Sequence, residues 1–168
     1  MKKFSLFTIV ILVVILATCL VGCVKGTPIE FTNEDIAVFS NDDHGRAEDY
    51  TAATLVRSRD ELITFLAGEK TDYEIEEIAK FTEEFFEERA VLVLSHSVID
   101  FETYEIKKVA VDGDKLTLQL SRNRENEDLA EWYSVRQTLL SVSKSDVENV
   151  TKCSVVTSTV SSSFSFGF

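Results

Sequence analysis

The stretch TYEIKKVAVDGDKLTLQLS, residues 103–121, decides the fold that the sequence predicts. Its second half alternates strictly, with leucine at every second position, which is typical of a strand with one buried face. Its first half also alternates, but the apolar phase slips by one residue at Lys107-Lys108, as a β-bulge would cause. Between the halves, Asp112-Gly113 favours a tight turn. The sequence therefore predicts an antiparallel hairpin with a bulge in its first strand.

Other runs in the chain have the composition of strands. The run AVLVLS is continuously apolar and too short for a helix, which favours a central strand buried on both faces. The remaining runs are rich in β-branched or alternating apolar residues. Together with the hairpin they give about seven strands, the other five being residues 35–40, 51–58, 90–95, 132–142 and 151–160.

Two helices are predicted between residues 58 and 89. The first begins at Ser58, with a glutamate three residues later as in a capping box, and ends at Gly68. The second begins at Thr71 and carries apolar residues at three- and four-residue steps to Phe85, with a break near Phe81 left open. Because the helices cluster early, the sequence predicts an α+β fold with a mainly antiparallel sheet and two helices packed on it.

Residues 1–22 have the layout of a secretory signal peptide, in which a basic start precedes an uncharged, mostly aliphatic run. The sequence LVGC, ending at Cys23, resembles the lipobox of bacterial lipoproteins. That resemblance implies that the chain is cut before Cys23, that its thiol is acylated, for example with palmitate, and that the protein sits on the extracytoplasmic face of the cell membrane. A retained anchor helix and a cut without lipid are the alternatives.

The rest of the chain is predicted to hold one domain. Residues 23–34 contain the only proline and are predicted to form a lipidated tether, and residues 35–160 form a single α+β domain. Residues 161–168, SSSFSFGF, form an uncharged tail of serine, phenylalanine and glycine.

Charge restricts the partners that this chain can have. The chain carries 17 basic and 29 acidic residues, a formal charge of −12. Without the two lysines of the leader the charge would be −14, from 15 basic and 29 acidic residues. Such a surface repels nucleic acid and anionic lipid, and it favours basic partners or cations.

Cysteine usage predicts no disulfide framework. Of three cysteines, Cys19 would leave with the leader and Cys23 would carry lipid. Cys153 then has no partner in the chain, and its strand-like surroundings predict a small buried apolar residue.

The motifs of common catalytic sites are absent from the sequence. The two histidines, His44 and His96, lie in no metalloprotease or Cys/His metal-binding pattern, and neither a nucleophile elbow nor a phosphate-binding glycine loop occurs. We therefore expect no enzymatic activity and no cofactor.

Two local groups are candidates for binding. Asp42, Asp43 and His44 offer oxygen and imidazole ligands for a weak divalent-ion site, but they lack the spacing of a calcium loop, which favours a solvated loop. Trp132 and Tyr133 are adjacent on a predicted strand and would point to opposite faces, so that the outward one could anchor a partner. Packing of both rings within the fold is the alternative.

Roughly residues 58–160 resemble a group of uncharacterised lipoproteins, mostly of Gram-positive bacteria, and the PrcB C-terminal domain. The resemblance is carried by FTEEFFEERAVLVLS (81–95), YEIKKVAVDGDKLTLQL (104–120), DLAEWYSV (128–135) and SKSDV (143–147). The PrcB C-terminal domain occurs in lipoproteins that stabilise a surface protease complex. The resemblance implies a protein-binding role for this chain.

The sequence thus predicts a membrane-anchored extracytoplasmic lipoprotein that acts as a protein-binding or accessory module. Its partner would be another exported protein, such as a protease. The alternatives are an extracytoplasmic hydrolase with an unrecognised site and a weak cation-binding domain that senses the envelope.

Overall fold

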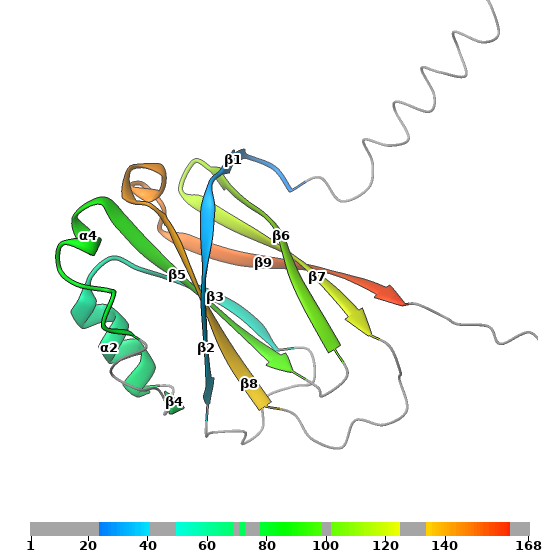
Figure 1. Ribbon diagram of the computed structural model, residues 1–168. Coiled ribbons are helices and arrows are strands. Elements are labelled where there is room, and N and C mark those ends of the chain that lie inside the picture. Colours follow the sequence, from blue (N-terminus) through cyan, green and yellow to red (C-terminus); the bar gives the residue numbers. More distant parts are fainter. Residues whose placement is uncertain are drawn as a thin grey trace, which may run out of the picture.

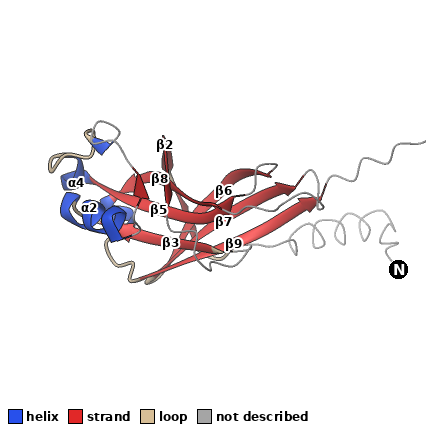
Figure 2. Cartoon of the chain, turned by 90° about the horizontal axis from the view of Figure 1, so that it is seen from below, coloured by secondary structure: helices blue, strands red, loops and turns tan. Residues whose placement is uncertain are grey.

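The computed structural model describes residues 24–40, 50–68, 71–72, 78–98, 102–124 and 134–161. Within these residues the chain has an α+β fold, in which two mainly antiparallel sheets face each other and helices lie against one of them (Figures 1 and 2). The helical elements are α2 (Arg59–Gly68), α4 (Phe85–Glu88) and the 3-10 helix η1 (Lys144–Val147). The strands are β1 (Thr27–Ile29), β2 (Phe31–Ser40), β3 (Thr51–Val56), β4 (Thr71–Asp72), β5 (Arg89–Val98), β6 (Glu102–Asp112), β7 (Lys115–Arg124), β8 (Ser134–Ser143) and β9 (Lys152–Ser161).

The strands divide into a four-stranded sheet, in the order β1-β6-β7-β9, and a five-stranded sheet, in the order β3-β5-β8-β2-β4. Among the described strands, β7 and β9 pair in parallel and the other neighbours pair antiparallel. The predicted fold class is therefore confirmed, with the short strands β1 and β4 added to those that the sequence predicted.

The hairpin of β6 and β7 confirms the prediction for residues 103–121. The register shifts between Ile106 and Lys108, where the sequence predicted a bulge. Asp112 pairs with Lys115, so the connection lies one residue later than predicted. Gly113 has a φ of 61°, a left-handed conformation that glycine adopts without steric cost.

Two apolar layers hold the sheets and helices together. The predicted central strand β5 contributes to both, because its alternate residues point to opposite faces. Leu92 and Leu94 are buried between the two sheets, where they join leucines of β7 and β8. Val91 and Val93 are buried on the other face, against α2 and the phenylalanines near α4.

The start of α2 has the capping arrangement that the sequence predicted. The hydroxyl of Ser58 accepts a hydrogen bond of 3.2 Å from the backbone N–H of Glu61. The Glu61 carboxylate accepts one of 2.7 Å from the backbone N–H of Arg57. Leu62 and Leu66, one turn apart, then bury their side chains against the five-stranded sheet.

The second predicted helix is only partly confirmed, since Ile78 and Phe85–Glu88 are helical but its predicted start is a strand. Thr71-Asp72 pair with β2 as strand β4, and the chain leaves helical geometry at Phe81, where the prediction had left a break open. The hydroxyl of Thr82 accepts a 3.2 Å hydrogen bond from the backbone N–H of Phe85, which starts the short helix α4 afresh. Phe81 and Phe86 each meet the ring of Phe85 edge-on, with ring centroids 5.1 and 5.2 Å apart. These aromatic contacts hold the segment around one apolar cluster.

The four-stranded sheet begins within the segment that was predicted as a tether. Strand β1 pairs with β6, and β2 follows it after a single residue. Gly26 precedes β1 with a φ of 112°, and a Cβ there would lie 2.5 Å from the carbonyl oxygen of Val111. A glycine is therefore required for this approach of the chain to β6.

Cys153 in β9 is half-buried against the core between the sheets. Burial raises the pKa of its thiol. This agrees with the prediction of a small apolar residue and keeps the sulfur protonated at neutral pH.

Candidate interaction surface

The residues that the sequence proposed as sites lie outside the described residues. Asp42, Asp43 and His44 belong to the connection between β2 and β3, and Trp132 and Tyr133 to the connection between β7 and β8. Cys23 precedes the first described residue. Lipidation, metal binding and the aromatic anchor therefore stay predictions.

Strands β3 and β9 are the edge strands of the two sheets and lie side by side (Figure 2). Strand β3 is hydrogen-bonded only to β5, and β9 only to β7, within the described sheets. No further strand pairs with the outer edge of either strand within the described sheets, although the two strands contact each other and the backbone of Leu55 in β3 hydrogen-bonds the Cys153 thiol of β9. Such edges are the usual template for pairing with another chain.

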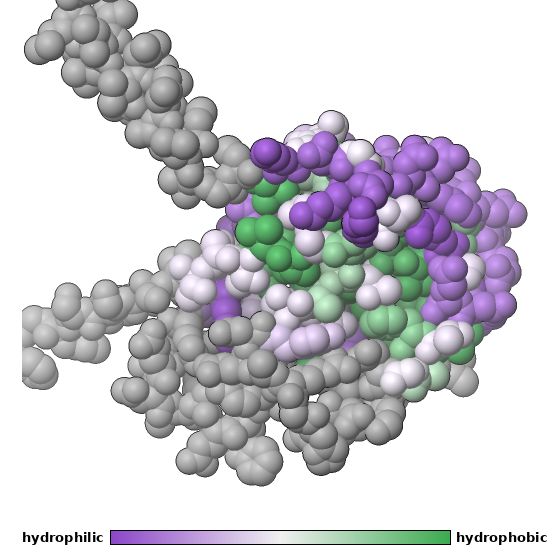
Figure 3. All heavy atoms as spheres, turned by 180° about the vertical axis from the view of Figure 1, so that it is seen from behind, coloured by the Kyte–Doolittle hydropathy of each residue, from purple (hydrophilic) through white to green (hydrophobic). Residues whose placement is uncertain are grey.

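Both edge strands lack charge apart from Lys152 at the start of β9. Strand β3 reads TAATLV, and β9 has no charged residue from Cys153 to Ser161, in a chain with a formal charge of −12. Val156 is 45% exposed, and Thr157, Ser158 and Thr159 are exposed beside it. Figure 3 shows this side of the molecule, with apolar and weakly polar residues in the middle and hydrophilic residues along the margin.

An apolar groove of about 460 Å³ continues this surface toward α2. Leu55 and Val56 of β3 and Phe65 of α2 line it, and the exposed residues Asp60 and Glu61 stand at its edge. We call the outer edges of β3 and β9, together with this groove, the β3–β9 surface. The β3–β9 surface was not predicted from the sequence, although strands almost without charge are unusual in so acidic a chain and could have indicated it.

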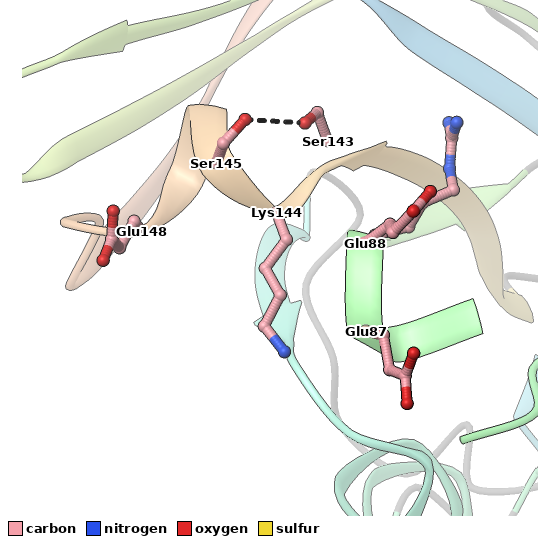
Figure 4. Close-up of a pocket in the computed structure, with 7 residues that line it drawn as sticks. Glu87, Glu88, Ser143, Lys144, Ser145 and Glu148 are labelled. Carbon is pink, nitrogen blue, oxygen red and sulfur yellow. Dashed lines mark hydrogen bonds between the residues drawn. The ribbon is translucent and has the colours of Figure 1, made fainter. Parts of the chain in front are cut away.

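A second depression, of about 570 Å³, lies between α4 and η1 and is strongly charged (Figure 4). Glu87 and Glu88 belong to α4 and Glu148 follows η1, and the three carboxylates point apart, so they do not converge on one position. The ammonium of Lys144 donates a 2.7 Å hydrogen bond to the carbonyl oxygen of Phe86. This depression has the features of a solvated surface and not of a ligand site.

A polar cluster around Glu34 is structural. The ammonium of Lys80 lies 2.6 Å from one carboxylate oxygen of Glu34, and the hydroxyl of Ser141 donates to the other. The guanidinium of Arg89 donates a 2.7 Å hydrogen bond to the same hydroxyl. Burial raises the pKa of Glu34, but the hydrogen bonds from Lys80 and Ser141 and the charges of Lys80 and Arg89 outweigh it, so the net pKa is lowered. The cluster joins β2, β5 and β8 to the segment before α4.

Metal-binding geometry is not found in the part of the chain that the structure describes, where no three histidine, cysteine, aspartate or glutamate side chains come together. His96, which lies in none of the catalytic or metal-binding patterns considered above, is 2% exposed and lies between the sheets. Its ring stacks obliquely on that of Tyr104, with centroids 4.3 Å apart.

Comparison of the chain with protein-family profiles, with curated proteins and with solved structures finds no match. Across the described ranges, the helices are too short or too polar to cross a bilayer.

Proposed function

We propose that this protein is a lipid-anchored extracytoplasmic accessory module that binds another exported protein through the β3–β9 surface. The anchor rests on the leader and on Cys23. The observation that carries the binding role is the pair of adjacent edge strands, uncharged apart from Lys152, with which no further strand pairs in the described sheets.

The partner that fits this surface has an extended segment with apolar and basic residues. An extended segment can pair its backbone with an exposed strand edge, and its side chains give specificity. Apolar side chains would fill the groove beside Phe65, and basic ones would meet Asp60 and Glu61 at its edge. The net charge of −12 also attracts a basic partner over longer distance. The resemblance to the PrcB C-terminal domain makes an exported protease the first class of partner to test.

Site-specific photocrosslinking in the native cells tests the binding role. A photoreactive residue replaces Val156 on the β3–β9 surface, and the control replaces Glu84, which is exposed before α4. We expect one exported protein to be crosslinked reproducibly from position 156 and not from position 84. Thr54→Asp should lower that yield, because it places a charge on the surface that the partner covers. The same crosslinked species from both positions, or none from position 156, would contradict the proposal.

The anchor is tested separately. Cys23→Ser should move the protein from the membrane fraction to the soluble fraction, since the thiol that carries the lipid is removed. Mass spectrometry of the native N-terminal peptide should show an acylated Cys23. An unmodified sulfur at that position would refute the anchor and leave the β3–β9 surface to be judged by crosslinking alone.

A further inference from the structure

The space between the sheets changes from apolar to polar along its length. Near the middle of β5 and β8, Leu92 and Leu140 are paired and fully buried. Four residues further along β5, the pair on the same face is His96 with Arg136. Residues two apart on a strand share a face, so both polar side chains are directed between the sheets.

The facing side of the opposing sheet also changes from apolar to polar residues along its length. In the β6–β7 hairpin, Ile106 pairs with Leu120, and two residues before Ile106 the pair is Tyr104 with Arg122. Arg122 is only 7% exposed, and its guanidinium lies 5.9 Å from the centroid of the Tyr104 ring. The phenol of Tyr104 donates a 2.6 Å hydrogen bond to the carbonyl oxygen of Ser97, which fixes the ring in place.

A cavity of about 450 Å³ lies where these polar ends meet. This volume is within the range of sites that hold small molecules. One part of its wall is aliphatic and the other is polar and cationic. The main contributors are Leu94, Ile106 and Leu120 on the first part, and His96, Tyr104 and Arg136 on the second.

Arg136 is the group in the cavity that would interact most strongly with a bound anion. Its Nε atom is buried and makes no hydrogen bond within the described part of the chain. Burial of a charged donor without a partner is costly, so an anion that reached it would gain a strong, charge-assisted interaction. Glu105 also lines the cavity, but its carboxylate is paired with Lys107.

We propose that this cavity binds a small amphipathic carboxylate. The carboxylate pairs with the guanidinium of Arg136, and the apolar body of the ligand lies against Leu94, Ile106 and Leu120. A single arginine suits a monoanion better than a phosphate dianion. The His96–Tyr104 pair forms a rigid wall beside the carboxylate. This site is distinct from the β3–β9 surface, and either can exist without the other.

Binding of 4-(trifluoromethyl)benzoate to the full chain in lipid nanodiscs tests this proposal by fluorine NMR, with empty nanodiscs as the blank. Three further probes separate the contributions: the neutral 4-(trifluoromethyl)benzyl alcohol, inorganic phosphate as a competitor, and the variant Arg136→Gln. The control variant Lys115→Gln removes an exposed positive charge of β7 outside the cavity.

We expect saturable binding of the benzoate that Arg136→Gln weakens by about tenfold or more, the size of a lost charge-assisted hydrogen bond, while Lys115→Gln leaves it unchanged. The alcohol should bind far more weakly, and phosphate should not compete. Thr138→Phe, which fills the cavity beside Arg136, should also abolish binding, and it keeps the test decisive if Arg136→Gln does not fold. Equal affinity for benzoate and alcohol, effective competition by phosphate, or benzoate binding that survives Thr138→Phe would overturn the proposal.

Discussion

Gln137 lies on the face of β8 that is directed at α2, opposite Ser95 of β5 and two residues from the buried Leu139. Its side chain has no exposed surface, and neither its Nε2 nor its Oε1 atom makes a hydrogen bond within the described residues. A buried amide in this position has lost its hydration and has gained no hydrogen-bond partner among the described residues in return. We therefore predict that Gln137→Met, which keeps the length and shape of the side chain, stabilises the protein.

The magnitude follows from the group that is removed. An unsatisfied buried polar group costs about 1–3 kcal/mol in proteins. The methionine side chain has a similar volume, so little of that gain should be lost to cavities or overpacking. The free energy of unfolding should rise by about 1–3 kcal/mol, and the melting temperature by roughly 3–10 °C.

Urea denaturation measures the change, with the midpoint shifting and the slope staying constant if only stability has changed. Gln119→Met is the matched control, because Gln119 is partly exposed on β7 and its replacement should change stability by about 0.5 kcal/mol at most. A Gln137→Met protein that is less stable than the wild type would refute the reasoning, since it would mean that the amide makes a favourable interaction.

Two further predictions concern Glu34 and Gly26. The pKa of Glu34 is lowered in the folded state, so its cluster stabilises the protein fully at a pH above the ordinary pKa of a glutamate. This stabilisation is lost as the pH falls through the folded-state pKa. Urea midpoints from pH 7 to pH 3 should therefore fall less steeply for Glu34→Gln than for the wild type, and parallel curves would contradict the assignment. Gly26→Ala should destabilise the protein by about 1–3 kcal/mol and speed hydrogen exchange of the β1 amides. The reason is that the φ of Gly26 is 112° and that a Cβ there would lie 2.5 Å from the carbonyl oxygen of Val111. Unchanged amide exchange in β1 would show that the close contact between residue 26 and β6 is not needed.

Local patterns predicted the local parts of the fold. The alternation in residues 115–121, the slip at Lys107-Lys108 and the turn glycine at position 113 are all short-range signals, and the hairpin of β6 and β7 has the predicted bulge. The capping box at Ser58 likewise predicted the start of α2. Each of these elements is determined by residues only a few positions apart.

Pairings between distant residues were not predictable in the same way. Strand β4 exists because Thr71-Asp72 meet the end of β2, whereas the surrounding apolar spacing favours a helix. The parallel pairing of β7 with β9 passes over β8, which belongs to the other sheet. No local pattern carries that information.

The two proposed binding sites were not predicted from the sequence for the same reason. The β3–β9 surface joins strands that are distant in the sequence, and the cavity at Arg136 needs residues from both sheets. The pairing of Tyr104 with Arg122 follows from the hairpin register, so the sequence could have predicted this one polar pair.

The parallel pairing of β7 with β9 also sets the order in which the protein can assemble. Within the described sheets β9 is hydrogen-bonded to β7 alone, so β9 cannot pair before β7 has been made. Strand β1 likewise cannot pair before β6 has been made, since Thr27 pairs with Val111. Contacts between such distant residues form slowly. A chain that is still being synthesised would therefore expose the edge of β7 until β9 has formed.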